Sequence, residues 1–223
     1  MKCIILTRKK IQEDSLLLHC FSEDGALLFL KIPGVLKSKK RSALFLSPAT
    51  IWNFIIMGNL NTISIPKEMD LLHSPYDASP SYQELSAIQE LLQLTRYIKS
   101  GIENKNLYLK LEQLIMQWNF KNSLLTESIL NHFYLSFLQL AGFFHFSLVC
   151  NECNDNLDEW ADYLLNMGAL CPRCQKFTNT PDILKIPFQW IKDFLFDNTN
   201  SSFSNKESSI FREKILYYLK NEI

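Results

Sequence analysis

Residues 15–32, SLLLHCFSEDGALLFLKI, contain two apolar runs on either side of a short polar turn. The first run ends at Phe21, and the second begins at Ala26, directly after Gly25. Short apolar runs that flank a glycine-containing turn are typical of a β-hairpin. This stretch therefore predicts two antiparallel strands near the start of the chain.

Other short apolar or β-branched runs surround this hairpin, at residues 3–7, 42–46, 51–57 and 62–65. Five or six short strands are too few for a large sandwich, whereas a closed barrel leaves no unpaired edge. We expect residues 1–76 to form a small closed β-barrel. A five-stranded OB-fold barrel fits the number of strands, although the number alone does not fix their order.

After Pro75 the apolar residues recur with helical spacing, which predicts helices at residues 81–102, 107–118, 124–140, 182–196 and 207–219. Ser81 and Glu84 match a capping box at the start of the first of these helices. The loop-like segment 72–80 separates them from the strands. We expect an α+β protein in which residues 77–223 form an α-helical domain.

The chain shows no sign of secretion or of membrane insertion. Four apolar residues precede Arg8, Lys9 and Lys10, an order that does not match a signal peptide. The most apolar later window, residues 124–149, carries Glu127 and several other polar residues, which are costly in a bilayer. We expect a cytoplasmic protein with no membrane contact.

Four of the six cysteines form two C-x-x-C pairs with seventeen residues between them. In a reducing cytosol such pairs indicate metal ligands or redox centres rather than disulfides. Two C-x-x-C turns at this spacing let four thiolates converge on one zinc ion. We predict a zinc module at residues 148–178, with one Zn²⁺ bound by Cys150, Cys153, Cys171 and Cys174; the alternative is two unrelated thiol pairs.

The predicted zinc site is expected to be structural. A four-thiolate site has no open coordination position for catalysis. The segment between the cysteines carries five acidic residues and one basic residue, Arg173, so it would repel phosphate. We therefore assign the zinc to holding together an insert that has no core of its own.

The charge of the chain is unevenly distributed. Its 23 Lys and Arg residues balance 23 Asp and Glu residues, but residues 1–50 carry a net charge of +5 and residues 51–223 one of −5. A neutral total therefore does not exclude nucleic acid, because the N-terminal region is basic. The candidate DNA-binding residues are Arg8, Lys9, Lys10, Lys31, Lys37, Lys39, Lys40 and Arg41.

The densest basic stretch, PGVLKSKKR at residues 33–41, lies between two predicted strands. A loop of this composition suits contacts with phosphates, which depend on charge and reach. The alternative is a solvated loop with no ligand. Phe29, Phe45 and Trp52 offer aromatic faces on which bases stack, but we expect each of them to lie in the core.

Motifs typical of common enzymes do not occur in the sequence. It contains no Walker A, dinucleotide-binding, nucleophile-elbow or zinc-protease motif, and it has only six glycines. The four histidines are scattered along the chain. We expect no enzymatic activity.

Three stretches, in this order, resemble the RecO family of bacterial recombination mediators. They are residues 7–48, with the Gly25 hairpin and the basic loop; residues 137–153, FLQLAGFFHFSLVCNEC; and residues 169–174, ALCPRC. The resemblance implies an OB-fold barrel, a helical domain and a zinc module. It also implies binding of single- and double-stranded DNA, annealing of strands, and loading of RecA together with RecR.

The resemblance further implies binding of the acidic C-terminal tail of single-stranded DNA-binding protein by the helical domain. By charge alone, the candidates for that contact are Lys99, Lys105, Lys110 and Lys121. Two other hypotheses remain at this point. One is a zinc-stabilised adaptor that does not bind DNA, and the other is a zinc-dependent nuclease or hydrolase.

Overall fold

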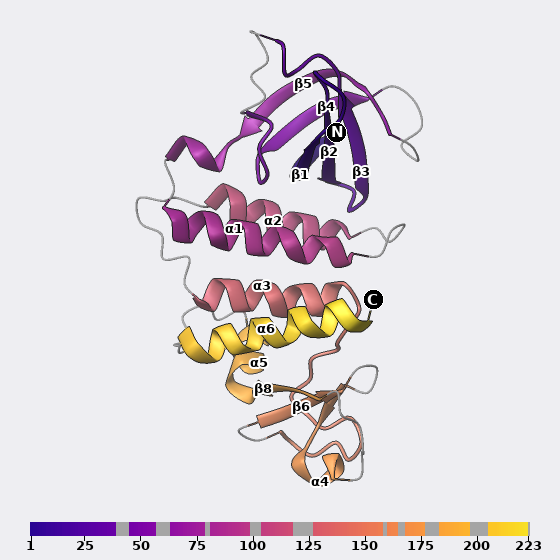
Figure 1. Cartoon of the computed structure of the whole chain (residues 1–223). Helices are drawn as coiled ribbons and strands as arrows, with labels where there is room; N and C mark the ends of the chain where they lie inside the picture. The colour runs from indigo at the N-terminus through magenta and orange to yellow at the C-terminus, as the bar shows by residue number, and fades with distance from the viewer. Residues whose placement is uncertain are drawn as a thin grey trace. The chain divides into compact units, whose positions relative to one another are not determined.

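The computed structural model describes residues 1–38, 45–56, 63–78, 81–98, 104–117, 127–157, 160–164, 168–176, 183–196 and 205–222. The chain is an α+β protein with two compact units, Met1–Leu124 and Leu125–Ile223 (Figure 1). The last strand of the first sheet ends at His73, close to residue 76, where the periodicity of the sequence changes. The proposed division into domains 1–76 and 77–223 stays a prediction.

The first unit contains a five-stranded antiparallel sheet with the order β3-β2-β1-β4-β5. Apolar and β-branched residues dominate its first four strands. A β-bulge at Leu6 shifts the pairing of β1 with β2. The strands are β1 (Lys2–Lys10), β2 (Leu16–Ser22), β3 (Leu27–Ile32), β4 (Ile51–Ile56) and β5 (Pro66–His73).

The sheet is open, so the prediction of a closed barrel was wrong. Among the described residues no strand ladder joins the edge strands β3 and β5. A single parallel bridge between Leu30 and Ser64 links β3 to the segment before β5. Its hydrogen bonds run from the Ser64 amide to the Phe29 carbonyl and from the Lys31 amide to the Ser64 carbonyl.

Two predicted strands differ from the structure. Residues 42–44 lie outside the described residues, and Phe45 and Leu46 are not in a strand. The predicted strand at 62–65 is instead a bridge at Ser64, and β5 begins at Pro66. Its sequence, PKEMDLLH, is polar because most of this edge strand is exposed.

The inner face of the sheet encloses the core of the first unit. Alternate residues of β1, β2 and β3 are buried there, as the twofold side-chain period of a strand requires. Val35 and Leu46 enter the same core from the loop between β3 and β4. The inner residues of β4 include Trp52, which is only 6% exposed, as predicted.

Two α-helices, α1 (Tyr82–Leu94) and α2 (Lys105–Gln117), accompany the sheet in the first unit, with short 3-10 helices η2 (Pro75–Ala78) and η3 (Thr95–Tyr97). The predicted capping box is confirmed, since Ser81 and Glu84 exchange side-chain to backbone hydrogen bonds. α2 contacts the sheet through a 2.8 Å ion pair between Lys2 and Glu112. The ring of Tyr108 packs edge-on against Phe21.

The second unit combines three longer helices with a small sheet of order β7-β6-β8. The elements are α3 (Glu127–Leu140), β6 (Trp160–Leu164), β7 (Gly168–Leu170), α4 (Pro172–Gln175), β8 (Ile183–Pro187), α5 (Phe188–Leu195) and α6 (Asn205–Glu222). α3 and α6 lie side by side, joined by buried hydrogen bonds from Asn131 to Ser208 and from Arg212 to Asn131.

The helix predicted at 182–196 is a strand followed by a helix. β8 ends at Pro187, and α5 begins at the next residue. The apolar residues of ILKIPFQWI fit both the twofold period of a strand and the 3.6-residue period of a helix. The sequence pattern therefore does not distinguish β8 from α5. Within the described ranges, every helix falls short of the length and apolarity needed to cross a membrane.

Candidate nucleic-acid interface and cysteine cluster

The outward face of β1, β2 and β3 brings together residues that the sequence analysis treated separately. Directly paired residues on neighbouring strands point to the same face of a sheet. Thr7 pairs with His19, and His19 pairs with Phe29. These three residues form what we call the aromatic row.

The rings of His19 and Phe29 are stacked, with centroids 4.6 Å apart and planes 12° from parallel. Phe29 is 47% exposed, so the expectation that it lies in the core was wrong. It occupies an outward position of β3, between the inward residues Leu28 and Leu30. The aromatic row therefore presents the exposed ring of Phe29, which is held in place by stacking on His19.

A second row, which we call the lysine row, lies next to the first. Lys9 pairs with Leu17, and Leu17 pairs with Lys31, two residues along each strand from the aromatic row. Lys9 is exposed and Lys31 is partly exposed. Two of the predicted DNA-binding lysines thus occupy the same row, beside an exposed aromatic ring.

The exposed apolar surface extends past the edge of β3. Ser64 bridges Leu30, and its neighbours Ile63 and Ile65 are both more than half exposed. No local sequence pattern marks these isoleucines or His19, because their placement depends on pairing with β3. The register of the strands is the signal that finds them.

Arg96, which the sequence analysis also missed, acts on the aromatic row from outside the sheet. It follows α1 in the 3-10 helix η3 and is exposed. The pKa of His19 is lowered, first because the ring is largely buried and second because of the positive charge of Arg96. Burial and Arg96 therefore both favour the neutral form of His19, and Arg96 adds a cation to this region.

The other predicted DNA-binding residues lie elsewhere. Arg8 donates a hydrogen bond to the Leu46 carbonyl at 3.5 Å, and Lys10 pairs with Leu16 at the end of β1. Lys37 lies 3.7 Å from Glu13 and 3.9 Å from Asp14 in exposed ion pairs, which are weak in water. Lys39, Lys40 and Arg41 fall outside the described residues.

Phe45 is 53% exposed, so the expectation that it lies in the core was also wrong. Of the lysines considered for an acidic tail, Lys105 and Lys110 lie on α2. Lys99 and Lys121 are outside the described residues.

The four cysteines of the second unit come together, as the sequence predicts. Their sulfur atoms all lie within 4.8 Å of one another, and Cys153 Sγ is 3.7 Å from Cys171 Sγ. Tetrahedral zinc with bonds of about 2.3 Å requires sulfurs about 3.8 Å apart. All six cysteines are free, so no disulfide competes with a metal here. The donor set fits a metal ion such as zinc.

Two local turns position these sulfurs. In the first, the Cys150 amide donates to the Asp155 carbonyl, and Asn154, with φ of 60°, reverses the chain. In the second, Cys171 caps α4, whose first residue is Pro172. The Asn151 amide donates to the Ala169 carbonyl and so joins the two turns. Both cysteine pairs thus stand on hydrogen-bonded backbone.

The thiols differ in how readily they ionise. Burial opposes ionisation of Cys150, but backbone amides of Cys153, Cys171 and Glu152 stabilise its thiolate and lower its pKa to about 6. Burial and the three neighbouring cysteines raise the pKa of Cys174 to about 12. Since metal binding requires thiolates, a divalent cation would supply the charge that lets the whole cluster ionise.

No family model matches the chain, and no curated protein matches it either.

Proposed function

We propose that the chain is a non-enzymatic DNA-binding protein of recombinational repair, which holds single-stranded DNA on the outward face of β1, β2 and β3. The observation that carries this proposal is the adjacency of the two rows. An exposed aromatic ring suits a stacked base, and lysines two residues away suit the phosphates beside it. A stacking surface with a basic border is the usual composition of a single-strand site.

The strand order supports an OB-type barrel. The order β3-β2-β1-β4-β5, with a bridge from β3 to the segment before β5, agrees with a partly open five-stranded Greek-key barrel. In that fold the face of the second and third strands binds oligonucleotides. Both rows cross β2 and β3, which is where this comparison would place the DNA.

The resemblance to the RecO family supports the wider role. It extends the proposal to double-stranded DNA, to strand annealing, and to loading of RecA together with RecR on DNA covered by single-stranded DNA-binding protein. In this proposal the cysteine cluster holds one structural Zn²⁺. It stabilises the second unit and takes no part in a reaction.

Salt-dependent binding tests the proposal. The double variant Lys9→Ala/Lys31→Ala should bind a single-stranded oligonucleotide more weakly. Its plot of log affinity against log salt should be shallower by about 1.4, because each lost phosphate contact on a single strand contributes about 0.7. The matched control is Lys214→Ala/Lys220→Ala, which removes two exposed lysines from α6. Equal slopes for both variants would refute the interface.

The same titration separates the proposal from the adaptor hypothesis. An adaptor that does not bind DNA should show no affinity for the oligonucleotide at physiological salt. A DNA-binding mediator should bind it and should speed the annealing of two complementary strands. Cleavage of the oligonucleotide that depends on added metal would instead favour a nuclease.

A further inference from the structure

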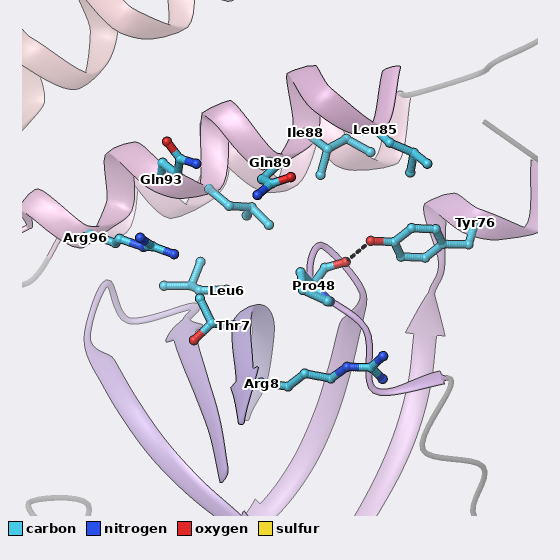
Figure 2. A pocket seen from close by; sticks show the side chains of 11 residues that line it. Leu6, Thr7, Arg8, Pro48, Tyr76, Leu85, Ile88, Gln89, Gln93 and Arg96 are labelled. Carbon is cyan, nitrogen blue, oxygen red and sulfur yellow. Dashed lines mark hydrogen bonds between the residues drawn. The ribbon is translucent and has the colours of Figure 1, made fainter. Parts of the chain in front are cut away.

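A cleft of about 420 Å³ opens between α1 and the sheet, within the first unit (Figure 2). Its volume falls inside the range of about 300–1,000 Å³ that is usual for small-molecule sites. Leu6 from the bulge of β1 and Ile88 and Leu92 from α1 supply apolar walls, and all three are nearly inaccessible to solvent. The cleft is therefore built on the core rather than on loops alone.

The charged groups that line the cleft are both positive. Arg8 and Arg96 are among its lining residues, and none of the described lining residues is acidic. Gln89 and Gln93, one helical turn apart, stand on the α1 side of the cleft, across from Leu6 and Thr7 (Figure 2). Two cations, two amides and an apolar wall suit a ligand that has an anionic group and a flat polar-edged ring.

The cleft is continuous with the aromatic row. Thr7 belongs to that row and also lines the cleft. Arg96 lines the cleft and is close enough to His19 to lower its pKa. A single strand of DNA that lies along Phe29, His19 and Thr7 would therefore reach the cleft at the β1 end of the aromatic row.

We propose that this cleft is a subsite for one unstacked nucleotide of the bound single strand. The base would lie against the apolar wall with its edge toward the glutamines, because a side-chain amide offers both the donor and the acceptor that base edges require. The phosphate would be held by an arginine, whose planar guanidinium matches it. This inference rests on the proposed single-strand binding.

An apolar peptide with a free terminal carboxylate is the nearest competing ligand. Such a peptide would satisfy the arginines and the apolar wall. However, it has no flat ring with a polar edge that would use the two glutamine amides. It also does not explain why the cleft adjoins the aromatic row. These two features favour the nucleotide.

The test uses the full chain and a set of twelve-nucleotide single strands, each with 2-aminopurine at a different position. The fluorescence of this base rises when it leaves its stack. The label at one position should show a rise in fluorescence on binding, whereas labels at the neighbouring positions should not. The double variant Gln89→Ala/Gln93→Ala should abolish that rise and weaken binding about five- to tenfold.

The matched control is Gln113→Ala, an exposed glutamine of α2 that does not line the cleft. Because Ala favours helices more than Gln does, all of these variants should fold. A positional rise that persists in Gln89→Ala/Gln93→Ala overturns the subsite, and so does the absence of any rise in the parent. Displacement of the labelled base by a short carboxylate-terminated peptide, but not by dAMP, overturns it in favour of the peptide.

Failure of the subsite differs from failure of the proposed function. If the Lys9→Ala/Lys31→Ala variant keeps the full salt slope of the parent, the face itself is wrong and the subsite falls with it. If that slope drops as expected but no label responds, only the subsite is wrong.

Discussion

The backbone amide of Asn104 donates a 3.2 Å hydrogen bond to the carbonyl of Gly25, so the turn between β2 and β3 lies directly against the start of α2. A Cβ on Gly25 would stand 2.1 Å from the Asn104 nitrogen, and the φ of Gly25 is +85°. The hairpin of β2 and β3 therefore also holds α2 in place. Only glycine permits this approach.

Gly25→Ala should destabilise the first unit by about 2–4 kcal/mol, because the methyl group meets backbone that cannot rotate away. Urea unfolding of the parent and the variant measures the difference. Gly34→Ala is the matched control. Gly34 also has a positive φ, +68°, but has open space around it, so its cost should be about 1 kcal/mol. Equal losses would contradict the close approach.

Phe29→Ala should lower affinity for single-stranded DNA about 5- to 100-fold, the usual cost of losing one stacked base. The slope against salt should not change, because no phosphate contact is removed. Fluorescence anisotropy at three salt concentrations gives both quantities. Tyr217→Ala removes an exposed ring from α6 and should leave both unchanged. If the two aromatic variants behave alike, Phe29 is not a stacking platform.

Cys171→Ser should reduce bound zinc from one ion per chain to almost none. Without the metal, the predicted zinc module at residues 148–178 should become sensitive to protease, while the sheet of the first unit stays resistant. Metal analysis and mass spectrometry of limited digests measure these effects. Arg173→Ala, a change beside the cluster that removes no sulfur, should retain the metal. Full zinc content in Cys171→Ser would contradict the assignment of this ligand.

The stability of the first unit should fall as the pH is lowered below the ordinary His19 pKa of 6.5. Since burial lowers the pKa in the folded state, the unfolded chain takes up a proton first, and protonation there favours unfolding. Well above pH 6.5 the histidine is neutral in both states, and this contribution vanishes. Urea unfolding at pH 7.5 and 5.5 should show a smaller acid loss for His19→Gln than for the parent. Identical losses would mean that His19 does not contribute to the pH dependence of the stability.

The sequence predicted features that depend on neighbours in the chain. Ser81 and Glu84 form their capping box because both partners lie within one turn. Each cysteine pair is set by a local turn, so the spacing of the cysteines is enough to indicate a shared site. The first hairpin follows from Gly25 in the same way.

Features that depend on distant pairing were not predictable. Phe29 lies in an almost wholly apolar run, and only the alternation of buried and exposed residues along β3 shows that it points outward. β5 is polar because it is an exposed edge strand, so its composition is typical of a loop. Arg96 acts on His19 across the fold, 77 residues away in sequence, and no local pattern marks that relationship.

β1 is the middle strand of its sheet, with Cys3, Ile4, Ile5 and Leu6 buried and its last three residues exposed. Both outward rows begin on this strand, so the proposed binding face cannot shift without disturbing the core beneath it. A face fixed in this way needs no rearrangement of its strands before a ligand arrives. The encounter step should then follow a single kinetic phase, before any base enters the cleft, and differences among DNA strands should show mainly in how long each remains bound.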